Sequence, residues 1–405
     1  MVLKNRWVCA VAGVAVLLLA GLVYAWSVLS APIAQEYPQW TKAELSLTFT
    51  IVMILFCVGC IVGGLLTGKV SSRVYVWTAA VLFLAGFLLA AGMTTLPQLY
   101  LGFGVICGFA SGIAYNAVMG TVNKWFPDKQ GLISGILLMG FGMSSFLVGK
   151  VYQACTPAAA GAWRQSFVVL GIITAVVLAV CAFWIRRPPE APVAKASGAA
   201  AEQEEVSTGR MLRRPAFCLY YVWASLLSAA GLALVSQASD IAYEVSPESS
   251  AATVATVVGV ISIFNGIGRV AAGAIFDGAG RRRTMLLVNI SFVLTGAVLL
   301  LALLTGSFVL LTAGFLLGGL SYGGVPSTNS AFVASYYGSR YYPLNFAVIN
   351  TSLIPASFGS TIAGALYDTW QTYESTYLMI AALGVAGMLL SAAISLCDRR
   401  EGRSR

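Results

Sequence analysis

The segment 264–283, FNGIGRVAAGAIFDGAGRRR, places one arginine, Arg269, inside an otherwise apolar stretch. A guanidinium stays charged at physiological pH, and its planar fork of N–H donors fits a carboxylate with two hydrogen bonds. Inside a membrane span such a residue is costly unless it faces other helices or water, and it usually marks a functional site. No acidic residue is expected well inside any span, so an anionic ligand is the favoured counter-ion of Arg269. The alternative is that Arg269 reaches the cytoplasm or bonds helix carbonyls.

Several polar and aromatic residues are candidates for the rest of such a site. Asn265 lies one turn before Arg269 on the same helix face, where it would orient the guanidinium, contact the ligand or form a plain interhelical hydrogen bond. Phenol and indole rings would make an apolar box with polar tips, suited to a small carboxylate, with ordinary packing as the alternative for each. The further candidates are Tyr24, Tyr115, Asn116, Tyr322 and Trp223.

The elements that must position these residues are membrane-spanning helices. Of 405 residues, 59% are hydrophobic and 10% are charged, whereas soluble domains are about half apolar and about a quarter charged. Long apolar runs recur along the whole chain, which predicts an all-α membrane protein. The predicted spans, twelve in all, are 7–34, 44–68, 74–94, 98–122, 131–153, 165–185, 215–240, 252–276, 284–304, 308–335, 344–366 and 373–396.

The distribution of basic residues predicts the orientation of the spans. Of the 24 Lys and Arg residues, the predicted outer segments hold only Lys42, Lys150 and Arg164, and all others except Arg269 fall in cytoplasmic segments. We therefore expect a multi-pass protein of the inner (cytoplasmic) membrane with both termini in the cytoplasm. The same distribution explains the net charge of +9 without a nucleic-acid partner.

Other classes of chemistry find little support in the composition. The chain has no histidine, and its eight cysteines are scattered, mostly within spans, so we expect no metal site, no cofactor and no enzymatic activity. The lipid bilayer and a small solute are the expected partners, and a monomer is the expected state.

A polar stretch divides the chain into two halves of six spans each. Residues 187–213, rich in Pro, Ala, Ser and Glu, are predicted to be a cytoplasmic linker, and STGRMLRRP (207–215) is predicted to include a short surface helix. The predicted bundles are residues 1–186 and 214–405. They echo each other weakly, as in GLLTGKVSSR (64–73) and GAIFDGAGRR (273–282). Two six-helix bundles in one orientation are typical of transporters, with a site near the midplane between them.

The loop GAIFDGAGRRR (273–283) resembles the signature loop of the major facilitator superfamily. The matching positions are Gly273, Asp277, Gly280, Arg281 and Arg282. The resemblance implies the fold of that superfamily and a gating role for this loop. In it Asp277 would pair with Arg281 or Arg282, or would cap the start of a neighbouring helix. A surface ion pair, worth less than about 1 kcal/mol, is the alternative.

A narrower resemblance covers most of the chain. GLVYAWSVLSAPI (21–33), YNAVMGTVNKWFPDKQGLISGILLMGFG (115–142) and FNGIGRVAAG (264–273) resemble the oxalate/formate antiporter branch, close to the monocarboxylate transporters. In that branch an arginine of span eight binds the substrate carboxylate, which implies this role for Arg269. The oxalate carriers also have a lysine in span eleven, where this sequence has Leu353 and no other Lys or Arg.

These observations together predict a secondary active transporter of a small organic anion that works by alternating access. One buried cation favours one carboxylate, as in formate, lactate or pyruvate. Anion exchange is favoured over proton symport, because an empty carrier would leave Arg269 without a counter-charge. The alternatives are a dicarboxylate exchanger such as an oxalate/formate carrier, an exporter of another solute class, and a sensor that does not transport.

Overall fold

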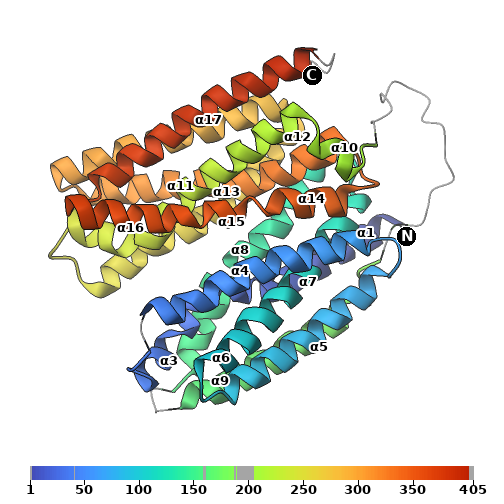
Figure 1. Cartoon of the computed structure of the whole chain (residues 1–405), viewed down its shortest axis with the longest axis horizontal. Coiled ribbons are helices and arrows are strands. Elements are labelled where there is room, and N and C mark those ends of the chain that lie inside the picture. The colour runs from blue at the N-terminus through green and yellow to red at the C-terminus, as the bar shows by residue number, and fades with distance from the viewer. Residues whose placement is uncertain (1, 41, 158–160, 187, 189–204, 401–405) are drawn as a thin grey trace. The chain divides into compact units, whose positions relative to one another are not determined.

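The computed structural model describes residues 2–40, 42–157, 161–186, 188 and 205–400, which form helices joined by short turns (Figure 1). Its first half contains α1 (Val2–Ala20), η1 (Gly21–Ala25), α2 (Trp26–Leu29), α3 (Ala31–Glu36), α4 (Lys42–Leu65), α5 (Ser72–Ala91), α6 (Leu96–Leu99), η2 (Tyr100–Cys107), α7 (Gly108–Val122), η3 (Asn123–Trp125), α8 (Gln130–Cys155) and α9 (Ala162–Cys181). Its second half contains α10 (Thr208–Leu212), α11 (Pro215–Val245), α12 (Ala251–Thr305), α13 (Phe308–Tyr337), α14 (Tyr342–Asn350), α15 (Leu353–Ala356), α16 (Phe358–Trp370) and α17 (Glu374–Arg400).

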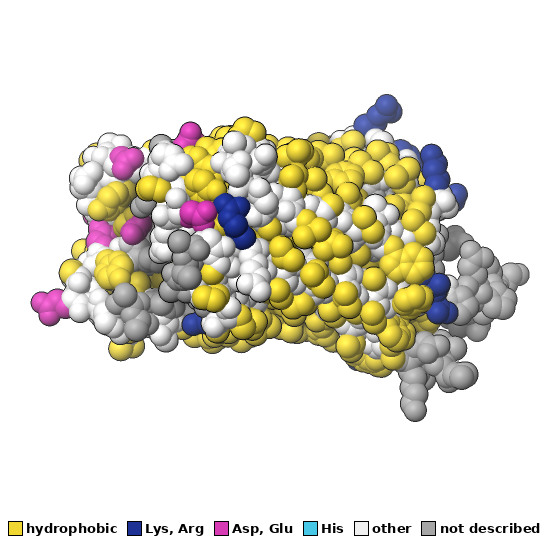
Figure 2. Space-filling model, turned by 90° about the horizontal axis from the view of Figure 1, so that it is seen from below, with side chains coloured by type: hydrophobic (Ala, Val, Ile, Leu, Met, Phe, Trp, Pro, Cys, Tyr) yellow, Lys and Arg dark blue, Asp and Glu magenta, His cyan; other side chains and the backbone are white. Residues whose placement is uncertain are grey.

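Eleven stretches of the described chain are helical, long and apolar enough to cross a membrane. One of them, Thr256–Thr305, is 50 residues long. It holds two spans, because Gly280 in its middle has φ 77, a left-handed conformation that glycine adopts without strain. The described helices therefore include the twelve predicted spans. On the face shown in Figure 2, hydrophobic side chains cover the middle, acidic ones gather at one end and most basic ones at the other.

One compact unit comprises Met1–Asp128, Gly140–Glu205 and Gly338–Val348. Within it, α5 and α9 lie side by side (Figure 1). Phe87 and Phe167, one from each of these helices, pack with ring centroids 5.7 Å apart in the buried core. Helices α4 and α7 approach closely at Gly59, where a β-carbon would lie 3.1 Å from the main-chain nitrogen of Ile113.

The other compact unit comprises Lys129–Met139, Val206–Tyr337 and Ile349–Arg405. Helices α12 and α13 pack tightly because Gly268, Gly319 and Gly323 leave no room for a side chain between the two backbones. The two units follow the predicted halves except that the first turns of α8 and residues 338–348 are exchanged. The predicted bundle boundaries stay a prediction, since most of residues 187–213 lies outside the described part of the chain.

Local structure departs from continuous spans in three places. Span one contains the 3₁₀ turn η1, span four begins with the π-helical segment η2, and span eleven is interrupted at Thr351 and Ser352 between α14 and α15. The short helix expected before span seven is confirmed as α10, whose Met211 is buried. In transporters, interrupted helices commonly line a cavity, because their unpaired backbone groups need partners.

Candidate functional site

Arg269 lies in α12 with 8% of its surface exposed, and its guanidinium is held by two neutral acceptors. Its Nε donates to Oδ1 of Asn265 at 2.9 Å, and its Nη1 donates to the main-chain oxygen of Leu138 in α8. Asn265, four residues earlier, is 9% exposed and shares the helix face. In the described residues no carboxylate pairs with Arg269. The protein therefore orients the guanidinium without neutralising its charge.

The backbones around Arg269 approach one another at glycine positions. A β-carbon on Gly135 of α8 would lie 2.9 Å from Cα of Val270, and one on Gly323 of α13 would lie 3.0 Å from the main-chain nitrogen of Arg269. Tyr322, beside Gly323, is 7% exposed and close enough to Arg269 for an electrostatic interaction. Of the predicted binding residues, the structure thus brings Arg269, Asn265 and Tyr322 together within one unit.

Hydrogen bonds hold the first turns of α8 against α12 and α13. Asp277 at the end of span eight accepts hydrogen bonds at 2.8 Å from the main-chain N–H groups of both Gly131 and Leu132. One turn further, the buried hydroxyls of Ser134 and Ser330 are 2.7 Å apart. In these two bonds Asp277 caps the start of α8, which is one of the predicted options, and its gating role stays a prediction. The contact near Leu138 follows another turn along, so a single face of α8 carries all of these bonds.

Gly273 and the basic residues of the signature loop have different surroundings. Gly273 packs against the backbone of Gly131, where a β-carbon would lie 2.6 Å from the carbonyl carbon. Arg282 is exposed, whereas Arg281 is buried and forms an ion pair with Asp398 of α17. Arg281 also donates to the hydroxyl of Tyr336 at 2.9 Å. Asp398 is a buried acid at the end of span twelve that sequence analysis did not single out.

Two candidates of the other unit lie in its core. Tyr115 packs among aromatic rings, with its centroid 5.0 Å from that of Phe141 and 5.7 Å from that of Phe346. Asn116 is 1% exposed and donates from Nδ2 to the main-chain oxygen of Pro343 at 2.7 Å. Tyr24 lies in η1, and its side chain falls outside the described residues. A binding role for these three residues stays a prediction.

Trp223 holds together three helices of the second unit. Its indole N–H donates to Oδ1 of Asn289 at 2.9 Å, and Nδ2 of Asn289 donates to the hydroxyl of Ser391 at 2.9 Å. Trp223 and Asn289 are completely buried. These hydrogen bonds join α11, α12 and α17, so Trp223 stabilises the packing of the three helices. Its role in substrate binding stays a prediction.

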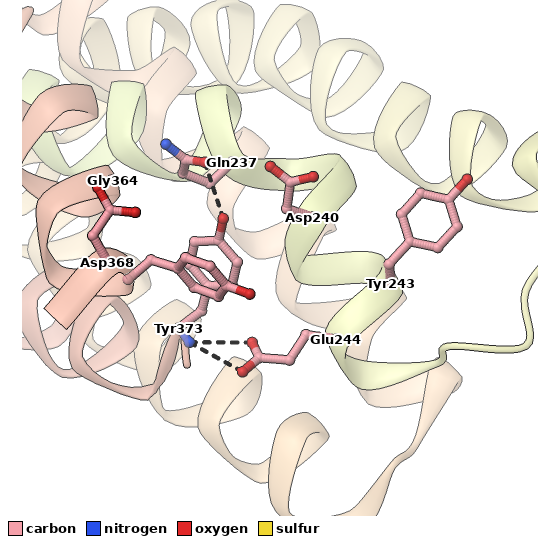
Figure 3. A pocket seen from close by; sticks show the side chains of 8 residues that line it. Gln237, Asp240, Tyr243, Glu244, Gly364, Asp368 and Tyr373 are labelled. Carbon is pink, nitrogen blue, oxygen red and sulfur yellow. Dashed lines mark hydrogen bonds between the residues drawn. The ribbon is translucent and has the colours of Figure 1, made fainter. Parts of the chain in front are cut away.

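A cavity of about 600 Å³ opens near the predicted outer ends of α11 and α16, lined by Gln237, Asp240, Tyr243, Glu244, Gly364, Tyr367, Asp368 and Tyr373 (Figure 3). Both carboxylate oxygens of Glu244 accept from the main-chain N–H of Tyr373, at 3.1 and 3.2 Å. Three carboxylates and no basic side chain line this cavity, so it does not suit an anion.

Comparison with known proteins gives an independent view of the chain. The model of the Major Facilitator Superfamily family matches residues 11–354 and 248–404. The chain is 28% identical over 385 residues to the oxalate:formate antiporter of Oxalobacter formigenes, covering 91% of this chain and 87% of that protein. It is 25% identical over 340 residues to monocarboxylate transporter 13 of Bos taurus, covering 81% and 75% of the two chains.

Solved structures resemble the whole chain at the level of the fold. The structure of FucP in the outward conformation aligns with a TM-score of 0.68 at 13% identity, covering 96% of this chain and 99% of that chain. The proton:xylose symporter XylE aligns with a TM-score of 0.66 at 14% identity, covering 96% of each chain.

Proposed function

Because the chain belongs to the major facilitator superfamily and is a multi-pass membrane transporter, we propose that it carries a small organic anion whose carboxylate binds Arg269. The single observation that carries this proposal is the state of that guanidinium. It is almost fully buried in a span, held by two neutral acceptors, and paired with no carboxylate of the described chain.

The hydrogen bonds of Arg269 leave donors available for a ligand. A guanidinium has five N–H groups, and in the described residues protein acceptors engage it only through Nε and Nη1. A carboxylate that accepted from the remaining N–H groups would supply both the missing acceptors and the missing charge. Tyr322, which is buried in α13 beside Gly323, is the further residue that we propose for contact with the same ligand.

Of the two buried arginines in the described chain, Arg281 already pairs with Asp398, so Arg269 alone is offered to the substrate, which supports one carboxylate on it. Span eleven, where the resemblance to the oxalate carriers would require a lysine, has Leu353 and contains no Lys or Arg. A second carboxylate would lose its hydration without gaining an opposite charge, which is unfavourable in a low-dielectric site. Formate, lactate and pyruvate are therefore the favoured substrates, and oxalate exchange is the alternative that the similarity to the oxalate:formate antiporter keeps open.

Anion exchange is the favoured coupling mode. Neutral acceptors only partly compensate a buried guanidinium, so a carrier without substrate would have to change conformation around an uncompensated buried charge, which is unfavourable. Proton symport is the alternative. It would need a buried acid that titrates, and the buried Asp398 already has Arg281 as its counter-ion.

The first turns of α8 supply the proposed gate. The contacts of Asp277, Ser330 and Arg269 with one face of α8 fasten the predicted cytoplasmic end of a first-half helix to second-half helices. By the orientation that the basic residues predict, these bonds must break before substrate leaves to the cytoplasm. Asp277 is the proposed latch, because its carboxylate satisfies two N–H groups that the helix itself leaves without acceptors.

A thermal-shift screen of the purified protein with monocarboxylates, dicarboxylates and sugars tests the proposed function. A ligand at 100 times its Kd should stabilise the protein by about 2.7 kcal/mol. We expect stabilisation by a monocarboxylate that disappears in Arg269→Ala and persists in Arg283→Ala, which changes an exposed arginine of the same helix. Stabilisation by sugars alone, or an equal response of Arg269→Ala, would contradict the assignment.

A further inference from the structure

Two arginines, Arg73 and Arg186, meet just past the end of α9, in the unit that does not contain Arg269. Nη2 of Arg73 and Nε of Arg186 both donate to the main-chain oxygen of Phe183, at 3.4 and 2.8 Å respectively. These two nitrogens therefore lie at most 6.2 Å apart. No carboxylate of the described residues pairs with either guanidinium. Like charges at this distance repel unless an anion lies beside them.

The local backbone adds to the positive potential. Arg73 is the second residue of α5, and the N-terminus of a helix is itself positive, so an arginine is unfavourable there. Arg186 is also fixed in place, because its main-chain oxygen accepts the indole N–H of Trp125 at 2.7 Å. The indole of Trp77 donates to the main-chain oxygen of Ala179 at 3.1 Å and ties α5 to α9. Two positive side chains and a positive helix end are thus held together by the fold.

The surroundings of the two arginines are those of a membrane boundary. Helices α5 and α9 are both long and apolar enough to span a membrane, and Arg73 and Arg186 lie at their adjoining ends. The aromatic side chains of Trp77, Phe183 and Trp184 are 37%, 51% and 48% exposed, which is typical of the interface between lipid tails and headgroups. The distribution of Lys and Arg assigns this end to the cytoplasm, where the leaflet is rich in anionic lipids.

We propose that Arg73 and Arg186 bind the phosphate of an anionic phospholipid. A phosphodiester offers oxygen acceptors that match two guanidinium forks. Its acyl chains would lie along α9, where Val176 and Val180 are 55% and 47% exposed. A soluble phosphate would gain the charge contacts but not this apolar surface. The ligand is therefore a lipid, and its site is separate from the residues proposed for substrate.

Binding of phosphatidylglycerol to the purified full-length protein tests the proposal, with phosphatidylcholine of the same acyl chains as the reference lipid. Native mass spectrometry counts the bound lipid, and a thermal-shift titration gives its apparent affinity. Each basic residue near an anionic surface strengthens binding by about fivefold, so Arg73→Gln/Arg186→Gln should bind phosphatidylglycerol about 30-fold more weakly. Phosphatidylcholine should bind both proteins equally, which also shows that the variant is folded.

A control pair separates a defined site from general surface charge. Arg282→Gln/Arg283→Gln removes two exposed arginines that the predicted orientation places on the same side, and it should leave phosphatidylglycerol affinity within about twofold of wild type. Equal losses in both double variants, or no preference for phosphatidylglycerol in the wild type, would overturn the proposal. So would competition by inorganic phosphate as strong as that by lipid. If the glutamine variant does not fold, Arg73→Lys/Arg186→Lys, which keeps the charges but not the forks, must still weaken binding measurably.

Discussion

The contact of Asp277 with α8 gives a prediction whose size follows from the structure. Gly131 and Leu132 belong to the first turn of α8, so their N–H groups have no acceptor within the helix and donate to Asp277 instead, each at 2.8 Å. Asp277→Asn keeps the shape of the side chain. It replaces two acceptor oxygens with one and removes the negative charge beside the positive helix end.

We estimate the cost of this change at about 1–2 kcal/mol, from one charge-assisted hydrogen bond in a partly exposed position plus the lost interaction with the helix dipole. Since about 1.4 kcal/mol is a tenfold change in an equilibrium constant, opening of this turn should become about 5–30-fold more frequent. Hydrogen–deuterium exchange of a peptide covering 126–139 measures this directly. Exchange of the Gly131 and Leu132 amides should accelerate by that factor.

The matched control is Asp368→Asn, which makes the same chemical change at an exposed acid of α16. It should leave exchange in residues 126–139 unchanged. If Asp277→Asn exchanges at the wild-type rate, the carboxylate does not protect the turn, and the proposed latch is wrong. If both variants accelerate exchange equally, a global loss of stability is responsible and the local argument fails.

Three further predictions concern stability and selectivity. Burial raises the pKa of Glu36, but hydrogen bonds, above all the one from Arg164, outweigh burial and hold this pKa below its ordinary value of 4.5. The Glu36–Arg164 pair should therefore stabilise the fold above that pH, and this stabilisation should be lost under stronger acid. The thermal unfolding temperature of Glu36→Gln should accordingly depend less on pH between about 5 and 3 than that of the wild type. Trp223→Phe should destabilise the protein by about 1–3 kcal/mol in chemical unfolding, because the buried Oδ1 of Asn289 loses its donor; a cost below about 0.5 kcal/mol would contradict this. Leu353→Lys adds a cation to span eleven and should give a dicarboxylate-dependent thermal shift that wild type lacks; an unchanged ligand profile would place residue 353 outside the site.

The fold was largely predictable because the membrane imposes simple rules. Apolar length predicted the spans, and the polar residues before span seven predicted α10. The neighbours Asn265 and Arg269 were predictable because i and i+4 residues share a helix face. The link between two spans at Gly280 required only that a glycine adopt a positive φ.

The remaining parts of the site depend on long-range packing that sequence spacing does not encode. The acceptor that Leu138 offers to Arg269 is a main-chain oxygen, which every residue has, so no residue type marks it. Glu36 pairs with Arg164 at 2.9 Å, and the 128 positions between the two residues put this contact beyond any local sequence pattern. Asp398 follows the last predicted span, and its burial against Arg281 depends on the packing of two helices far apart in the sequence.

The interrupted span eleven shows the same limit at the level of the backbone. Pro355 is compatible with a helix break, but the interruption at Thr351 and Ser352 lies three to four residues before it. The hydroxyl of Thr351 lies 3.0 Å from that of Tyr221 in α11, a tertiary contact that no local pattern predicts. The break therefore depends on helix packing as well as on the local sequence.

The central claim is that Arg269 binds the carboxylate of a transported anion, and exchange in proteoliposomes tests it most directly. Vesicles loaded with an unlabelled monocarboxylate should take up the same labelled anion through the wild type and through Arg283→Gln, which changes an exposed arginine. Uptake through Arg269→Gln should fall by about 100-fold, because a charge-assisted, bidentate contact worth about 3 kcal/mol is lost. Wild-type rates in Arg269→Gln, or transport of a neutral solute in place of any carboxylate, would contradict the account.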